Sequence, residues 1–180
     1  MSRLAIDRRC RDGRRVLRTA APVALCIAMI SCASDRAGRR SLGKPPQDAQ
    51  PAHLVMGVLG RIIDSDENGF PDTIVVVVNV MIRVHPVPIT PPGTFVFRLE
   101  DEEGKVLVRW ELDEESTRAA RRPATLIGPG YVFRLSILDQ IPDAMPPTSM
   151  SLSATFLPTV GEPAESSGRK YVRFGRDRGY

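Results

Sequence analysis

Residues 62–83 read Ile-Ile-Asp-Ser-Asp-Glu-Asn-Gly-Phe-Pro-Asp-Thr-Ile-Val-Val-Val-Val-Asn-Val-Met-Ile-Arg, an acidic turn that leads into a β-branched run. Consecutive Val and Ile residues are stiff at χ1 and pack well on a pleated surface. An unbroken apolar run is typical of a strand that is covered on both faces. The stretch therefore predicts a central strand over 73–84, preceded by a turn in which Gly69 supplies a positive φ.

Six further strands are predicted on either side of this one, because apolar and polar residues alternate between Pro- and Gly-rich turns. Their ranges are 53–63, 94–100, 106–112, 131–138, 150–156 and 171–174. Strands 94–100 and 106–112 should form a hairpin whose turn includes Gly104. We expect the four prolines within 86–92 to prevent regular pairing there. The polar, Arg-rich stretch 113–124 is a loop or a helical turn, with a helix expected over 115–121.

The pattern predicts an all-β protein, an immunoglobulin-like antiparallel β-sandwich of about seven strands. Antiparallel strands with one apolar face need a second sheet to cover them. The sandwich should occupy 53–176, with a tail at 177–180 and Trp110 as a core residue. The Cys pair of antibody domains is absent, and an up-and-down barrel is the alternative fold.

The N-terminal region has the layout of a secretory signal peptide, which we place at 1–31 and expect to be disordered or helical. Seven Arg residues precede an apolar stretch over 19–30 that is too short to be a permanent membrane span. Of the 25 basic and 21 acidic residues, 7 and 2 lie before residue 32, so the rest carries 18 and 19, a net charge of −1. The basic pI belongs to this leader, which argues against nucleic acid as a partner.

Met29-Ile30-Ser31-Cys32 resembles the lipobox of bacterial lipoproteins, in which a small residue precedes the Cys that is acylated and becomes the new N-terminus. The resemblance implies lipidation of Cys32 and a membrane partner reached through the lipid, on the periplasmic or cell-surface side. Arg14-Arg15 also resembles a twin-arginine signal, although Arg18 departs from that pattern. Two alternatives stay open: plain secretion after cleavage near Ala33 or Ala37, and an uncleaved N-terminal anchor.

Residues 32–52 have few large apolar side chains and no periodicity, so we expect a flexible tether between lipid and domain. Past Cys32 the chain contains no other cysteine. These features indicate an exported protein that binds a protein or glycan partner or has a structural role.

The hairpin Phe97-Arg-Leu-Glu-Asp-Glu-Glu-Gly-Lys-Val-Leu-Val-Arg-Trp110, followed by Ile127-Gly-Pro-Gly-Tyr-Val-Phe133, resembles the BsuPI-type (intracellular proteinase inhibitor) family. The likeness covers about 94–157, less than half of the chain. It implies an immunoglobulin-like fold and, as a second function, inhibition of a proteinase. Export departs from the location in the family's name, and no inhibitory residue is carried over.

One constellation has the spacing of metal ligands: the side chains of Asp64, Asp66, Asn68 and Asp72 with the carbonyl of Phe70. Calcium takes six to eight hard oxygens, and alternate positions of an acidic loop can supply most of them. The loop is similar to the calcium loops of dockerins and thrombospondin type 3 repeats, which implies calcium as a cofactor. Val75 stands where an EF-hand loop has its bidentate Glu. The alternative is a capped turn whose side chains bond local backbone N–H groups.

We predict no catalytic residue and a protein that is not an enzyme. His53 and His85 are the only histidines, and each is more typical of an exposed or packing position. The chain has no Gly-x-Ser-x-Gly elbow and no phosphate-binding glycine loop. A hydrolase, the third hypothesis, would need His85 beside an Asp and a Ser in a pocket.

Overall fold

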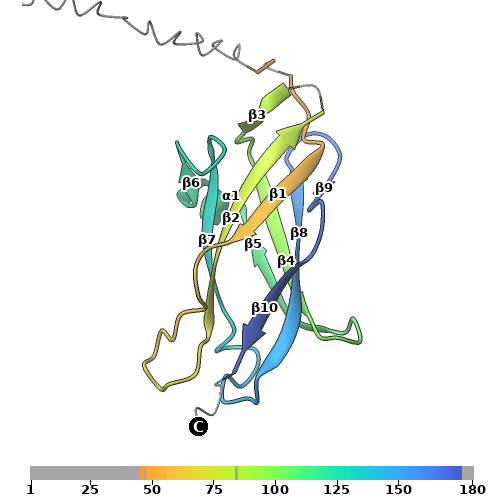
Figure 1. The fold of residues 1–180 in the computed structure, drawn as a ribbon. Helices are drawn as coiled ribbons and strands as arrows, with labels where there is room; N and C mark the ends of the chain where they lie inside the picture. Colours follow the sequence, from red (N-terminus) through yellow and green to blue (C-terminus); the bar gives the residue numbers. More distant parts are fainter. Residues whose placement is uncertain (1–44, 47, 84, 176–180) are drawn as a thin grey trace, which may run out of the picture. The chain divides into compact units, whose positions relative to one another are not determined.

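Strand β2, Thr73–Ile82, lies in the middle of one of two antiparallel sheets (Figure 1). The computed structural model describes residues 45, 46, 48–83 and 85–175, so the predictions for the signal peptide, Cys32 and the tail 177–180 lie outside the described residues. All residues of β2 except Val75 and Met81 are buried, which confirms a central strand covered on both faces.

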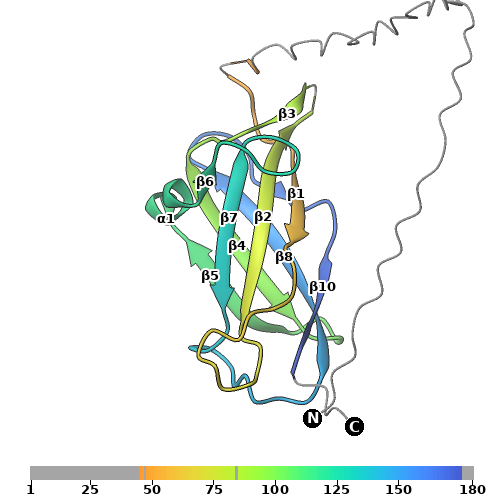
Figure 2. The same cartoon turned by 60° about the vertical axis from the view of Figure 1, so that its left-hand side comes forward.

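Two sheets make up the described domain. The first contains β1 (His53–Val58), β2, β3 (His85–Ile89), β6 (Arg121–Arg122) and β7 (Gly130–Ser136). The second contains β4 (Gly93–Glu100), β5 (Val106–Leu112), β8 (Thr148–Pro158), β9 (Ala164–Glu165) and β10 (Lys170–Phe174). The sheets face each other as a sandwich, which Figure 2 shows from a second side.

The strand order confirms the predicted immunoglobulin-like sandwich. The order β1-β2-β7-β6 corresponds to strands A, B, E and D of an immunoglobulin domain, and β10-β8-β4-β5 corresponds to G, F and C with an added C′ strand. All seven predicted strands are present, although β1 ends at Val58 and Ile63 forms only an isolated bridge with Thr73. Strands β3, β6 and β9 were not predicted.

The prediction that prolines prevent pairing over 86–92 is wrong for the first part of that segment. Strand β3 pairs with β2 through Val80 opposite Ile89 and Ile82 opposite His85, with a register shift between the two pairs. An edge strand pairs along one side only, so it tolerates residues that lack an N–H group. The prolines therefore place this strand at an edge of the sheet and do not exclude it from the sheet.

The core is centred on Phe95, whose ring lies 4.7–5.9 Å from the rings of four other aromatic residues. Phe97 and Phe156 come from the second sheet, and Tyr131 and Phe133 come from the first. Trp110, expected in the core, lies half-buried on edge strand β5, where its Nε1 donates to the Ser136 carbonyl at 2.7 Å. The alternating faces of β4, β7 and β8 thus meet between the sheets as predicted.

The described part of the chain contains a single short helix, α1 (Glu114–Ala119). It begins one residue before the helix predicted over 115–121 and ends two residues before it. Asp113 caps it, because its Oδ1 accepts a hydrogen bond from the Ser116 N–H at 2.8 Å. Among the described residues, no helix is both long and apolar enough to cross a membrane.

The loops gather at the two ends of the sandwich (Figures 1 and 2). Strand β3 and the β6–β7 and β8–β9 loops lie at one end, and the acidic loop before β2 and the β7–β8 loop lie at the other. Along one side the two sheets are joined, because the Ser167 N–H donates to the Leu54 carbonyl of β1 at 3.0 Å while β9 pairs with β8.

Candidate functional site

The acidic loop brings three of its predicted ligands together. Oxygen atoms of Asp64, Asp66 and Asp72 all lie within 4.8 Å of one another. Asp72 is fully buried, Asp64 is half-buried and Asp66 is exposed. The loop thus presents one face of carboxylates to solvent with a buried carboxylate behind it.

Asp72 is held by donors from both sides of the loop. Its Oδ2 accepts the Ser65 N–H at 2.6 Å, and its Oδ1 accepts the hydroxyls of Ser65 and Thr73, each at 2.5 Å. Burial pushes the pKa of Asp72 upward, but these hydrogen bonds to the charged form outweigh burial and leave the pKa below its ordinary value of 3.8. Asp72 is therefore a charged residue that closes the base of the loop.

Asp64 and Asp66 bind the backbone of the same loop. The carboxylate of Asp64 accepts the N–H groups of Asn68 at 3.1 Å and Gly69 at 2.7 Å, and Asp66 also accepts the Asn68 N–H at 3.2 Å. The backbone can present these N–H groups because Glu67 and Gly69 have φ values of 61° and 89°. These contacts are those of the capped turn, the alternative to a calcium site.

Asn68 extends the loop to a neighbour that the sequence did not predict. Its Nδ2 donates to Asp66 at 2.9 Å and to Asp143, in the β7–β8 loop, at 2.5 Å. Its Oδ1 accepts the Phe70 N–H at 2.8 Å. Asp143 lies 75 residues along the chain, and no local pattern connects it to the loop.

The donor set fits a calcium ion in part. Three of the five predicted residues offer converging oxygens, but Oδ1 of Asp72 already accepts two hydroxyls, and a carboxylate oxygen has only two lone pairs. Val75, at the position of the EF-hand Glu, belongs to β2 and pairs with Arg134. Any ion would therefore rest mainly on Asp64 and Asp66.

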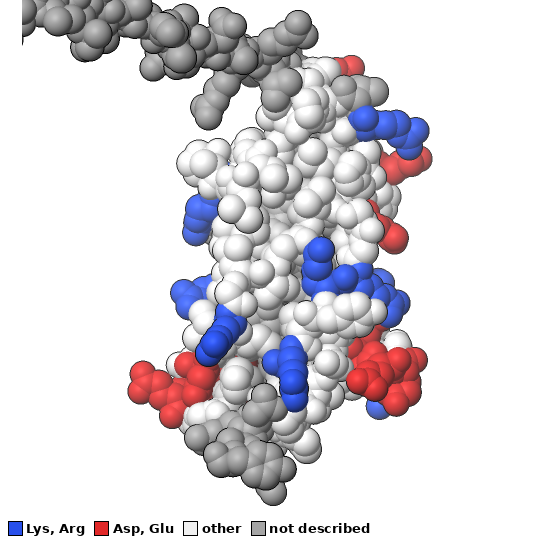
Figure 3. Space-filling view, viewed as in Figure 1, with Lys and Arg blue, Asp and Glu red and all other residues white. Residues whose placement is uncertain are grey.

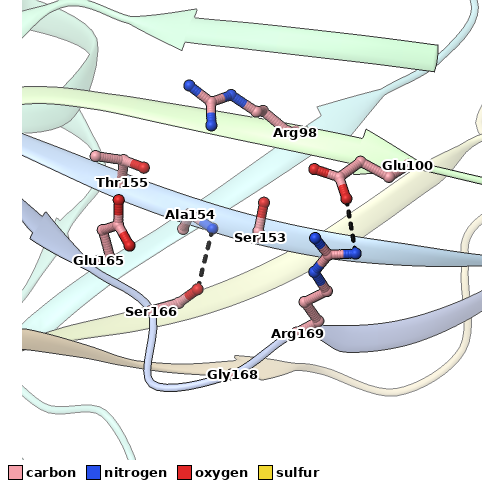
Figure 4. Close-up of a pocket in the computed structure, with 9 residues that line it drawn as sticks. All are labelled: Arg98, Glu100, Ser153, Ala154, Thr155, Glu165, Ser166, Gly168 and Arg169. Atoms are coloured by element: carbon pink, nitrogen blue, oxygen red, sulfur yellow. Dashed lines mark hydrogen bonds and ion pairs between the residues drawn. The ribbon is translucent and has the colours of Figure 1, made fainter. Parts of the chain in front are cut away.

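A second feature, a polar hollow of about 230 Å³, lies on the outer face of the second sheet (Figure 4). Arg98 and Glu100 reach into it from β4, and Ser153 and Thr155 come from β8. The buried Glu100 carboxylate pairs with Arg169, whose Nη1 lies 2.9 Å from Oε2.

The opposite wall of the hollow comes from the segment around β9. Glu165 and Ser166 lie there, and the Ser166 Oγ accepts the Ala154 N–H at 3.3 Å. The sequence analysis predicted the strands β4 and β8 but no strand between 156 and 171, so it missed this wall. The resulting hydroxyls and charges of both signs can hydrogen-bond a polar ligand.

The two histidines lie apart from both features. His53 begins β1, and His85 begins β3, where its Nδ1 accepts the Val87 N–H at 3.2 Å. Neither histidine lines the polar hollow. The hydrolase hypothesis, which needs His85 beside an Asp and a Ser in a pocket, therefore stays a prediction.

The comparisons with known proteins add no assignment. No family model matches the chain, and searches of the curated proteins and of the solved structures return no match.

Proposed function

We propose that this protein is an exported lipoprotein, anchored to a membrane through acylated Cys32, whose sandwich is a non-enzymatic binding or structural module. One observation carries the proposal: an Arg-rich segment, a short apolar segment and Ser31-Cys32 follow one another ahead of a β-domain that begins at His53. This order is the layout of a lipid-anchored domain on a tether.

The charge distribution also supports export. The basic residues that raise the pI belong to the leader, and the remainder of the chain has a net charge of −1. A body without cysteine beyond Cys32 has no thiol that an oxidising compartment could cross-link. The route, general secretion or twin-arginine, does not affect the anchor.

Mass spectrometry of the mature N-terminus tests the proposal. We expect a diacylated or triacylated Cys32 and a protein that fractionates with membranes. Cys32→Ser should release the protein from the membrane fraction, whereas the matched variant Cys26→Ser, within the apolar segment, should leave it bound. A mature chain that starts at Ala33 or Ala37 without lipid would support plain secretion instead.

We place the binding site for a protein or glycan partner at the polar hollow of the second sheet. Its support is the meeting of Ser153, Thr155 and Glu165 with two arginines in one concave surface. Titration with soluble cell-wall glycans, followed by NMR, should shift the signals of these residues, and Thr155→Ala should weaken the binding. Glu111→Gln on the neighbouring edge strand is the control.

The two alternative functions, proteinase inhibition and hydrolysis, can each be tested separately. A proteinase inhibitor of BsuPI type would slow a serine protease panel at micromolar concentration. A hydrolase would turn over ester or peptide substrates and lose activity in His85→Ala.

We also propose that the acidic loop binds Ca²⁺ weakly, mainly through Asp64 and Asp66. The support is the spacing of the loop, which has oxygen side chains at alternate positions Asp64, Asp66, Asn68 and Asp72, as calcium-binding loops do. Thermal unfolding with and without Ca²⁺ tests this.

A further inference from the structure

Three segments at one end of the sandwich carry no charge, although the exposed residues Arg83, Arg122 and Glu162 border them. The segments 85–92, 123–130 and 158–161 contain no Asp, Glu, Lys or Arg. They are neighbours in space, because the Thr159 N–H donates to the Pro92 carbonyl at 3.1 Å, and a Cβ added to Gly128 would lie 3.0 Å from Cδ of Pro88. Figures 1 and 2 show these segments at the same end, which we call the uncharged end.

Aliphatic side chains project from the uncharged end. Leu126 is 89% exposed and Ile127 49% exposed on the β6–β7 loop, and Val160 is 75% exposed on the β8–β9 loop. In Figure 3 the β6–β7 loop forms a white projection without charged residues. Exposed aliphatic side chains on two loops at the same end are candidates for contact with an apolar partner.

The opposite end of the sandwich is acidic. The loop before β2 contributes Asp64, Asp66 and Glu67, and the β4–β5 turn contributes Glu102 and Glu103, all but Asp64 exposed. Figure 3 shows acidic residues clustered toward this end. A surface of anionic lipid repels such an end and leaves the uncharged end free to approach it.

The chain enters the domain at the uncharged end. The Ala52 N–H donates to the Met81 carbonyl, near the end of β2, at 2.8 Å. Next to it a hollow is lined by Gln50, Arg83 and Glu162, which places the start of the described chain beside the β8–β9 loop. The segment that leads from Cys32 therefore joins the domain beside Val160.

The length of this segment favours a short distance between the bilayer and the uncharged end. Cys32 precedes Pro45 by 13 positions. For the tether expected from the sequence, a flexible chain of that length would have a root-mean-square span of about 20 Å. The acidic end lies at the far end of the domain from this entry point, because a ten-residue strand such as β2 is about 33 Å long.

We infer that the uncharged end rests on an anionic phospholipid bilayer, with Leu126, Ile127 and Val160 at the boundary between headgroups and acyl chains. The inference depends on the proposed lipid anchor. The acidic loop then faces away from the membrane, and the polar hollow of the second sheet stays accessible from the side.

The test uses the full chain, processed in bacteria and reconstituted into vesicles of phosphatidylethanolamine and phosphatidylglycerol. Once the leader is removed and Cys32 is acylated, an engineered cysteine is the only free thiol. Leu126→Cys and Val160→Cys, each labelled with the polarity-sensitive dye NBD, should shift to the blue on reconstitution and be quenched several-fold by brominated lipids. The NBD emission should not shift for labels at three control sites: Asp66→Cys and Glu103→Cys on the acidic end, and Tyr171→Cys, an exposed site on β10.

The experiment distinguishes the membrane contact of the uncharged end from the lipidation of Cys32. Mass spectrometry of the same samples reports acylation of Cys32. If Cys32 is acylated and the labels at 126 and 160 are as aqueous as those at 66 and 103, the inference is wrong and the anchor stands. An unacylated mature chain overturns both. A blue shift already present in detergent, with a dimeric mass in sedimentation, would assign the uncharged end to a second copy and overturn the inference.

Discussion

Nδ2 of Asn79 donates to Oγ1 of Thr125 at 2.8 Å and so joins the central strand to the β6–β7 loop. The same Nδ2 donates to the Pro129 carbonyl at 2.8 Å, and the Thr125 hydroxyl donates to the Gly128 carbonyl at 2.7 Å. Asn79 is only 3% exposed, although it lies within a run of Val and Ile residues. The β6–β7 loop therefore supplies the hydrogen-bond acceptors that the buried Asn79 amide needs, and the same hydrogen bonds hold this loop against β2.

We predict that Asn79→Ala lowers the free energy of unfolding by about 1–3 kcal/mol, because it leaves Thr125 and the Pro129 carbonyl without their donor. Thr125→Val should cost less, since Asn79 keeps its bond to Pro129. Urea unfolding followed by the fluorescence of Trp110 measures both. A Thr125→Val loss larger than that of Asn79→Ala would contradict this account.

We predict that Asp72→Asn destabilises the protein by about 2–3 kcal/mol at pH 7. In the wild type the Ser65 N–H and hydroxyl donate to the Asp72 carboxylate, whereas in the variant the amide NH₂ group would face one of these donors. The pKa of Asp72 is lowered in the fold, so its contribution to stability is complete above its ordinary value of 3.8 and is lost as pH falls through the lower folded value. When the pH is lowered below 4, the free energy of unfolding should therefore fall less in Asp72→Asn than in the wild type.

Urea titrations at pH 7, 5, 4 and 3 measure the Asp72 effect. The exposed Asp139, in the β7–β8 loop, is the control, and Asp139→Asn should change stability by less than about 0.5 kcal/mol at any of these pH values. Parallel pH profiles for the wild type and Asp72→Asn would show that Asp72 is not the group responsible.

We predict that millimolar Ca²⁺ raises the melting temperature by a few degrees and that chelator reverses the rise, since an ion bound only to the folded state stabilises it by mass action. Asp66→Asn should abolish the shift, because it removes an exposed ligand of the loop. Glu103→Gln, an acidic residue of another turn at the same end, should preserve it. No shift in the wild type would leave the capped turn as the role of the loop.

We predict that Tyr131 resists ionisation in the folded protein. Burial raises its pKa to about 12, although the charge of Arg121 works against this, and its hydroxyl donates to the Pro91 carbonyl at 2.7 Å. The raised pKa means that the contribution of Tyr131 to stability is complete below pH 10 and is lost as pH rises toward 12.

Absorbance at 295 nm during alkaline titration measures the prediction for Tyr131. Of three tyrosines, one should ionise only near pH 12 or together with unfolding, and Tyr131→Phe should remove that step. The same variant should lose about 1 kcal/mol of stability at pH 7. An unchanged titration curve in Tyr131→Phe would mean that another tyrosine is the protected one.

The strands that could be predicted from the sequence are those long enough to show alternation. In β4, Phe95, Phe97 and Leu99 all face the core, as expected. The two-residue strands β6 and β9 have no period to detect, and β3 was missed because its prolines argued against pairing. Trp110 packs against the core but is only partly buried, because its strand lies at the edge of the sheet, which the sequence does not reveal.

The candidate site could be predicted only where it is local. Asp64, Asp66 and Asp72 lie in one turn, so their spacing along the chain fixes their proximity. The contact of Asn68 with Asp143 and the wall that Glu165 gives to the polar hollow depend on the packing of distant loops. Such contacts follow from the fold and leave no trace in the spacing of residues.

The bond from Ser167 to Leu54 has a mechanical consequence. A pull that reaches the domain through its N-terminal side first loads β1, which would otherwise be held only by β2. Because Leu54 is also fastened to the segment beyond β9, and β9 pairs with the long strand β8, tension spreads into the second sheet. If the domain is anchored through its N-terminal side as proposed, this bond would oppose the peeling of β1 away from the first sheet under tension.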